Sequence, residues 1–541
     1  MEMKRAYQIF LVITGLFISA WLNKEINAQS SEFNSLEQQV FYHIFLRSFY
    51  DSNGDGHGDL NGLREKLDYL QELGITSVLL TPLYYSDFYH NYFPIDFEKI
   101  DPEFGTKNDY FALLKEMHRR GMKLYMDMEI HYVTEDHLWY KDSYQNPSSP
   151  YSQYILYNGP NNTDPESMIF NLTELQSYDG KIIKCCTTDL YNQNVRDYDY
   201  NLFKYWVDPN RDGNFDDGID GFRIDHIMDD LDWKGKLTGL LSNFWKPLFE
   251  QLRAINPRII IIGEQADWSY GGDYFSKGDM NALFAFPLSQ SIRKFDAKDI
   301  EEKFRKTSEV TPKNKYQLTF IENHDMPRIA TILKGDLPKL KISAALNLLL
   351  KGVPIIYYGQ EIGMTGANGF GKFGSTDGND IPIREAFEWH KSVEGPGMAL
   401  WYKNTGAWWD QTNLKTNDGI SLEEEKIDPN SLWNFYKKLI TLRRANSAIQ
   451  TGRFQFLDDD NDQVLSFLRW DEAQAILVLM NLNDKEESAS LDISKFPVAL
   501  NSPKILELLN PAGGKSLEMN GKKFSVKLAN FDVEIWQINK N

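Results

Sequence analysis

Three carboxylates in this sequence follow short apolar runs and are of the type that can act together in catalysis. Asp225 ends the segment GFRID, Glu264 ends the pair GE, and Asp325 ends the segment ENHD. Two carboxylates that flank one bond suit glycoside hydrolysis, because one can attack the anomeric carbon while the other, held protonated, gives its proton to the leaving oxygen. The residue types therefore point to cleavage of a glycosidic bond.

Eight short apolar runs in the sequence are candidates for the strands that position these carboxylates. From about residue 38 to 360 the runs alternate with helical patterns, which is typical of parallel strands joined by crossover helices. Eight such units predict an α/β fold, a (β/α)8 TIM barrel, in which the carboxyl ends of the strands face the active site. The three carboxylates would then converge on one face. The predicted strands are Val40–Leu46, Ser77–Thr81, Lys123–Asp127, Gly221–Asp225, Ile259–Glu264, Ala282–Phe286, Gln317–Glu322 and Pro354–Tyr358.

Polar and β-rich segments interrupt and follow the barrel pattern. The barrel is predicted to comprise residues 29–131 and 206–445. The polar stretch 132–205 after the third strand is longer than an ordinary barrel loop and is predicted to form an inserted, loop-rich domain B. Residues 446–541 contain β-rich runs such as Val464–Trp470 and are predicted to form a C-terminal antiparallel β-sandwich.

The first 28 residues have the pattern of a secretory signal peptide. Lys4 and Arg5 precede the uncharged run Ile9–Leu22, and a polar stretch then ends at the small residue Ala28. The uncharged run is shorter than the roughly 20 apolar residues that a membrane span requires. We therefore expect residues 1–28 to be removed and the protein to be secreted or periplasmic, with no stable membrane span.

Charge and cysteine content exclude other functions. Acidic residues exceed basic ones by 77 − 58 = 19, and a net charge of −19 repels phosphate backbones, so we expect no nucleic-acid partner. Cys185 and Cys186 are the only cysteines, and neighbours in sequence rarely meet disulfide geometry. We expect free thiols and a monomeric protein.

Several segments, in order along the chain, resemble the α-amylase family of glycoside hydrolases (family 13). Besides GFRID, GE and ENHD, they are PEFGTKNDY (102–110) and GVPIIYYGQEIGM (352–364), and the likeness runs from about Val40 to the C-terminus. The resemblance implies that Asp225 is the nucleophile that forms a covalent glycosyl-enzyme and that Glu264 is the general acid and later the general base. It also implies that Asp325 binds hydroxyls of the sugar at the cleavage point.

The same resemblance implies residues that bind substrate. Arg223 would lie beside Asp225 and keep it ionised, because a nearby positive charge lowers the pKa of a carboxyl group. His324 would donate a hydrogen bond to the sugar on which Tyr92 stacks. Asp127 begins the family motif at the end of the third strand and is also expected in the substrate site.

The third-strand motif departs from the family pattern. It reads Asp127-Met128-Glu129-Ile130-His131-Tyr132, so His131 stands where a calcium-binding Asn is usual and Tyr132 where a substrate-binding His is usual. A tyrosine can still donate one hydrogen bond, and we therefore expect Tyr132 to bind substrate. Because of this departure, the sequence does not support the calcium site that family members usually have between the barrel and the insert.

Two oxygen-rich loops have spacings that suit calcium. Oxygen side chains at positions 1, 3, 5 and 9, with a carbonyl at 7 and glycine at 6, wrap a calcium ion. The first loop, which resembles the calcium loop after the first strand in several family members, has Asp51, Asn53, Asp55, His57 and Asp59. The second loop contains Arg211, and its candidate ligands for a possible second calcium are Asp208, Asn210, Asp212, Asn214 and Asp216.

The motifs indicate that a glycosidic bond is cleaved, but they say less about which linkage between the sugars is cleaved. We expect hydrolysis of α-1,4-linked glucose polymers or oligosaccharides. An oligosaccharide-active α-glucosidase, an α-1,6-glucosidase or a transglycosylase of the same family is the alternative, because residues 226–229 lack the Lys-His pair that many starch-cleaving members carry. A catalytically weak glucan-binding protein is an alternative of another class. The presence of Asp225, Glu264 and Asp325 argues against it.

Overall fold

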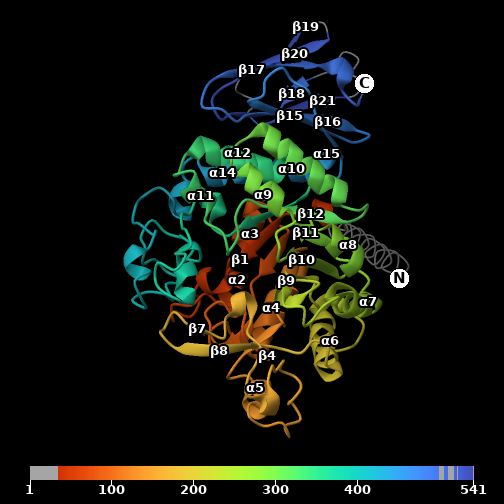
Figure 1. Ribbon diagram of the computed structural model, residues 1–541. Coiled ribbons are helices and arrows are strands. Elements are labelled where there is room, and N and C mark those ends of the chain that lie inside the picture. The colour runs from red at the N-terminus through yellow and green to blue at the C-terminus, as the bar shows by residue number, and fades with distance from the viewer. Residues whose placement is uncertain (1–34, 499–504, 510–516, 521, 540–541) are drawn as a thin grey trace, which may run out of the picture.

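The computed structural model describes residues 35–498, 505–509, 517–520 and 522–539, and the predicted signal peptide (1–28) lies outside them. Eight parallel strands close into a barrel in the order β1-β13-β12-β11-β10-β9-β5-β2, which confirms the predicted (β/α)8 fold (Figure 1). The barrel strands are β1 (Phe41–Ile44), β2 (Ser77–Leu80), β5 (Lys123–Met128), β9 (Gly221–Ile227), β10 (Ile260–Gln265), β11 (Ala282–Phe284), β12 (Tyr316–Thr319) and β13 (Val353–Tyr357).

The barrel strands read as apolar runs because both of their faces are buried. Successive side chains of a strand point to opposite sides. Leu79 of β2 therefore packs inside the barrel, while Val78 and Leu80 pack outward under the helices. Gly221 begins β9 at a close approach, since a Cβ atom there would lie 2.3 Å from the carbonyl oxygen of Ile260.

Helices surround the barrel (Figure 1). The α4 helix is fixed at its start by Thr106 and Asp109, whose side chains each accept a hydrogen bond from the other residue's backbone N–H, at 3.3 and 2.9 Å. The longer helices are α4 (Lys107–Arg119), α6 (Gln193–Val207), α7 (Lys246–Ile255), α10 (Ala297–Val310), α12 (Leu337–Leu349) and α14 (Leu432–Ala445). The shorter ones are α2 (Leu60–Glu65), α3 (Leu67–Leu73), α5 (Leu138–Ser143), α8 (Gly272–Gly278), α9 (Phe286–Ile292), α11 (Ile329–Ile332), α13 (Leu422–Glu425) and α15 (Ser447–Gln450).

The segment between β5 and β9 contains a small antiparallel sheet in the order β6-β8-β7. Its strands are β6 (Tyr132–Thr134), β7 (Glu174–Gln176) and β8 (Ile182–Thr187), and β8 carries the buried free thiols Cys185 and Cys186. The segment also includes α6, which packs against α7 beside the barrel. The limits of an inserted domain at residues 132 and 205 stay a prediction. A two-stranded ribbon, β3 (Tyr84–Ser86) with β4 (Pro94–Ile100), follows β2.

Two antiparallel sheets form the C-terminal domain, as predicted. Leu468 and Leu477 of the larger sheet share an apolar core with Phe524 of the smaller one. The opposite face of the larger sheet, with Phe467 and Val478, packs into the main core of the barrel. The larger sheet has the order β14 (Arg453–Phe456), β15 (Val464–Trp470), β16 (Gln474–Asn481), β21 (Val533–Asn539), β18 (Ile505–Glu507), and the smaller has β17 (Glu487–Asp492), β20 (Lys523–Leu528), β19 (Glu518–Asn520). None of the helices described here is long and apolar enough to cross a bilayer.

Candidate active site

One buried arginine joins three carboxyl groups from neighbouring barrel strands. Arg223 of β9 is 1% exposed, and its Nη1 donates to Oδ2 of Asp127 on β5, at 2.5 Å, and to Oδ1 of Asp225. Its Nη2 lies 2.7 Å from Oε2 of Glu264 on β10. Arg223 is paired in register with Asp127 and with Ile262, so strand alignment sets this arrangement. The structure thus brings four of the predicted residues together.

Asp225 is held in the ionised form. Burial alone would raise its pKa, but the positive charges of His226 and Arg223 hold the pKa well below its usual range. Nδ1 of His226 lies 3.1 Å from Oδ2 of Asp225, and although desolvation lowers the pKa of His226, the carboxylate raises it to about 10. A carboxylate in this state can act as a nucleophile.

Glu264 has the opposite protonation state. Burial raises its pKa, and this effect, helped by the negative charge of Asp225, outweighs the attraction of Arg223 and brings the pKa to about 8. Glu264 is therefore mostly protonated at pH 7. Two adjacent carboxyl groups whose surroundings move their pKa values apart are the arrangement expected of a nucleophile and a general acid.

Tyr92 lies between Asp127 and His324, and Asp325 lies beside Arg384. The hydroxyl of Tyr92 donates to Oδ2 of Asp127 at 2.8 Å and lies 2.7 Å from Nε2 of His324, and the rings of Tyr92 and His324 stack with centroids 5.5 Å apart. The side chain of Asp325 is 35% exposed. Nη2 of Arg384 lies 3.2 Å from Oδ1 of Asp325, and its Nε donates to the backbone oxygen of His324 at 2.9 Å.

Tyr132 lies apart from these contacts. It is fully buried, and its hydroxyl donates to Oδ1 of Asp232 at 2.5 Å. Its predicted contact with substrate stays a prediction.

Two site residues escaped the sequence reasoning. Arg384 lies in the loop after β13, outside every motif considered, so no sequence signal marked it. Glu129 is a glutamate that directly follows the apolar strand β5, and an acidic residue at that place is a usable signal. It is fully buried, and one oxygen of Glu129, one of Asp225 and a ring nitrogen of His226 all lie within 4.8 Å of one another.

The first predicted calcium loop is ordered by its own side chains. Asp51 accepts the backbone N–H groups of Gly54 and Gly56, at 2.6 and 2.8 Å. Asp55 accepts from the backbone of His57, and Asp59 caps α2 by accepting from Gly62, both at 2.8 Å. Carboxylate and amide oxygens are the donors that calcium prefers, so the residue types fit the ion. The ring of His57 faces Asp55 and Glu103 at 3.5 and 3.4 Å, which leaves only its backbone carbonyl for a metal.

The second predicted calcium loop is also held by hydrogen bonds among its own side chains. The amide of Asn210 donates to Asp212 and to Asp217, at 3.1 and 2.8 Å, whereas Asp216 accepts from its neighbour Asn214 by its side chain, at 3.4 Å. One buried oxygen each of Asp208 and Asp217 has no hydrogen-bond partner. The calcium ligands predicted in this second loop stay a prediction.

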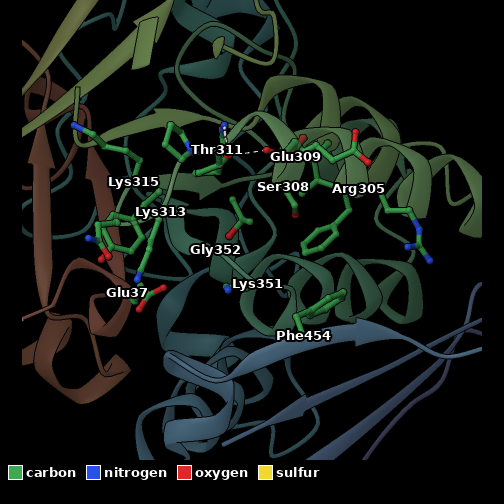
Figure 2. Close-up of a pocket in the computed structure, with 18 of the residues that line it drawn as sticks. Glu37, Arg305, Ser308, Glu309, Thr311, Lys313, Lys315, Lys351, Gly352 and Phe454 are labelled. Atoms are coloured by element: carbon green, nitrogen blue, oxygen red, sulfur yellow. Dashed lines mark hydrogen bonds between the residues drawn. The ribbon is translucent and has the colours of Figure 1, made fainter. Parts of the chain in front are cut away.

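A pocket on the opposite side of the barrel lies away from this chemistry. It has a volume of about 610 Å³, and Glu37, Lys351 and Gly352 at the amino ends of the strands line it together with Phe454 of β14 (Figure 2). A second pocket of about 540 Å³ is lined by the loops that follow Asp225 and Glu264. Neither Asp225 nor Glu264 lines this second pocket, whose lining begins at Met228 and at Asp267.

Two family models match the chain. The model of the α-amylase catalytic domain matches residues 43–452, which is most of the chain. The chain belongs to the α-amylase family. Residues 454–533 of this family member match the maltogenic amylase C-terminal domain. The protein is therefore an α-amylase-family glycoside hydrolase with a carbohydrate substrate.

Its relatives differ in the reaction that their names give. Alpha-amylase 3 of Dictyoglomus thermophilum is 31% identical over 459 residues, which cover 83% of this chain and 85% of that protein. An oligo-1,6-glucosidase of Parageobacillus thermoglucosidasius is 27% identical over 521 residues, covering 83% of this chain and 90% of its own. The solved α-amylase from H. orenii superposes with a TM-score of 0.75 at 26% identity, covering 93% of this chain and 99% of that one. Membership of the family leaves the linkage open.

Proposed function

We propose that this family member is a secreted, retaining α-glucan hydrolase that cleaves α-1,4-glucosidic bonds. The observation that carries the proposal is that Arg223 contacts both Asp225 and Glu264, whose surroundings lower the pKa of Asp225 and raise that of Glu264. A site that keeps one carboxyl group ionised and its neighbour protonated is prepared for attack and proton donation in the same step.

In the first step Asp225 attacks the anomeric carbon while Glu264 gives its proton to the leaving oxygen. In the second step Glu264, now ionised, takes a proton from water, and the water displaces Asp225. The contact of both carboxyl groups with one guanidinium supports this retaining course, because carboxyl groups held so close leave little space for a water molecule between nucleophile and sugar. Asp325, Tyr92 and His324 would hold the sugar.

The location and the metal are part of the proposal. The uncharged run Ile9–Leu22 after Lys4 and Arg5 supports export of the protein. Asp51, Asn53, Asp55, Asp59 and the carbonyl of His57 would hold a calcium ion, which would stabilise the loop after β1 and take no part in the chemistry. We expect a monomer, which sedimentation analysis would test.

An oligosaccharide-active enzyme is the second candidate. The pocket of about 540 Å³ is lined by Asp229, Asp230 and Trp233 from the segment after β9 and by Asp267 and Tyr274 from the segment after β10. We propose that these residues, which follow Asp225 and Glu264 in the sequence, contact the leaving group, so that they and not the catalytic pair would select the linkage.

The product profile tests both candidates. Purified protein is incubated with soluble starch, pullulan, isomaltose and maltoheptaose, with Asp225→Asn as the control, and the products are separated by chromatography. Short maltooligosaccharides from starch that are absent in the control would support α-1,4 hydrolysis. Cleavage restricted to isomaltose or other small substrates would favour the second candidate, and no product from any substrate would contradict both.

A further inference from the structure

Glu129 is a buried acid that the mechanism above does not use. It lies at the end of β5 with no exposed surface, and its Oε1 accepts the backbone N–H of His131. Its Oε2 is buried and accepts no hydrogen bond from an N–H group or from a hydroxyl group of the described residues. A carboxylate oxygen without a partner is costly in the interior of a protein, so the state of Glu129 needs an explanation.

The neighbour of this unpartnered group is the nucleophile. One carboxyl oxygen of Glu129 lies within 4.8 Å of one carboxyl oxygen of Asp225, in a cluster that also holds a ring nitrogen of His226. Each of the two carboxyl groups shifts the pKa of the other in the direction expected of hydrogen-bond partners. Two ionised carboxylates offer only acceptors, so a hydrogen bond between them requires that one of them carry a proton.

The proton belongs on Glu129. Asp225 is contacted by the cations Arg223 and His226, which favour its ionised form, whereas the other contact of Glu129 is His131, which burial keeps neutral by lowering its pKa to about 4. Burial, followed by the charge of Asp225, raises the pKa of Glu129 well above its usual value. The groups that face Glu129 are Asp225 and His226 of β9, His131 after β5, Tyr132 of β6 and Tyr84 of β3.

We propose that Glu129 is a positioning residue that remains protonated and donates a hydrogen bond to Asp225, fixing the nucleophile in place and favouring its ionised form. The inference rests on the proposed role of Asp225. With Arg223 and His226, Glu129 then completes a set of three donors around one carboxylate. Because its donor is neutral, Glu129 orients Asp225 without adding a charge that would weaken the attack.

Two substitutions separate this role from simple packing. Glu129→Gln keeps the shape and an N–H donor, whereas Glu129→Met keeps the approximate volume and removes the donor. Glu361→Gln is the matched control, because Glu361 is equally buried and accepts the hydroxyl of Tyr42 at 2.6 Å, away from Asp225. Circular dichroism checks that each variant folds.

The assay is the pH profile of kcat/KM for α-maltosyl fluoride, because fluoride leaves without a proton from Glu264 and the acid limb then reports Asp225. Loss of a hydrogen bond to the ionised form raises the pKa of Asp225, so the acid limb of Glu129→Met should move up by about one pH unit. Glu129→Gln and Glu361→Gln should keep the wild-type limb. An unmoved limb in Glu129→Met, or an equal shift in Glu129→Gln, would overturn the proposal.

A second measurement does not depend on the folding of the Met variant. The infrared difference spectrum of wild type minus Glu129→Gln at pH 7 should contain the band of one protonated carboxyl group, and a band of an ionised carboxylate there would refute the inference. Failure of the wild type to cleave α-maltosyl fluoride or any glucan would instead count against the proposed function. The two failures are therefore distinguishable.

Discussion

The pKa of Glu264 predicts a basic limit to activity that a change of leaving group should remove. A carboxyl group with a pKa of about 8 is about nine-tenths protonated at pH 7 and about one-tenth protonated at pH 9. Because the proton goes to the leaving oxygen, kcat/KM for maltoheptaose should fall about tenfold between these two pH values. The burial of Glu264 raises its pKa, so the limit lies well above that of an exposed glutamate.

The matched substrate is α-maltosyl fluoride, assayed at the same pH values by fluoride release. Its kcat/KM reports the glycosylation step and should stay nearly constant from pH 7 to 9. Glu264→Gln should lower kcat/KM for maltoheptaose by about 10²- to 10⁴-fold and that for the fluoride far less. An equal basic limb with both substrates, or no limb with maltoheptaose, would refute the assignment of Glu264 as the acid.

Three further outcomes are expected. Asp225→Asn should reduce turnover of every substrate by orders of magnitude with an unchanged circular dichroism spectrum, and near-normal rates would contradict its role as nucleophile. Chelation should lower the Tm if the Asp51 loop holds calcium, because an ion bound only to the folded state stabilises it; the same Tm after metal removal verified by elemental analysis would argue against the site. Arg384→Leu should lower kcat/KM about 10- to 100-fold, since it removes donors to Asp325 and to the backbone of His324, and unchanged kinetics would exclude that role.

The sequence predicts features that depend on a single strand, such as the position of the strand and of the carboxylate near its end. Barrel strands are buried on both faces, so their apolar runs are visible in the sequence. Asp225 and Glu264 lie within two residues of the ends of β9 and β10. The prediction for the seventh strand, Gln317–Glu322, extended too far, because β12 ends at Thr319 and the chain then turns toward Asp325. A polar residue after a strand and one within it look alike until the backbone pairing is known.

Contacts between distant segments were out of reach. Arg384 contacts Asp325 because the long loop after β13 brings it back to the carboxyl ends of the strands. The local sequence pattern does not show where such a loop will pack. Glu129 directly follows β5 and Asp225 lies on the neighbouring strand β9, and their contact depends on the register between these strands, in which Asp127 is opposite Arg223. The sequence therefore predicts the types of group in the site, and strand register decides which of them touch.

The larger C-terminal sheet has apolar side chains on both faces, one toward its partner sheet and the other toward the barrel. Arg469 of β15, fully buried, also donates to the backbone oxygen of Leu349 at the end of α12, at 3.1 Å. The C-terminal domain is thus packed firmly against the barrel and is not an independent module. A chain shortened after residue 452 would present Phe467's former contact surface to water, which favours aggregation, so natural exchange of this domain between relatives would require matched changes in the barrel helices beneath it.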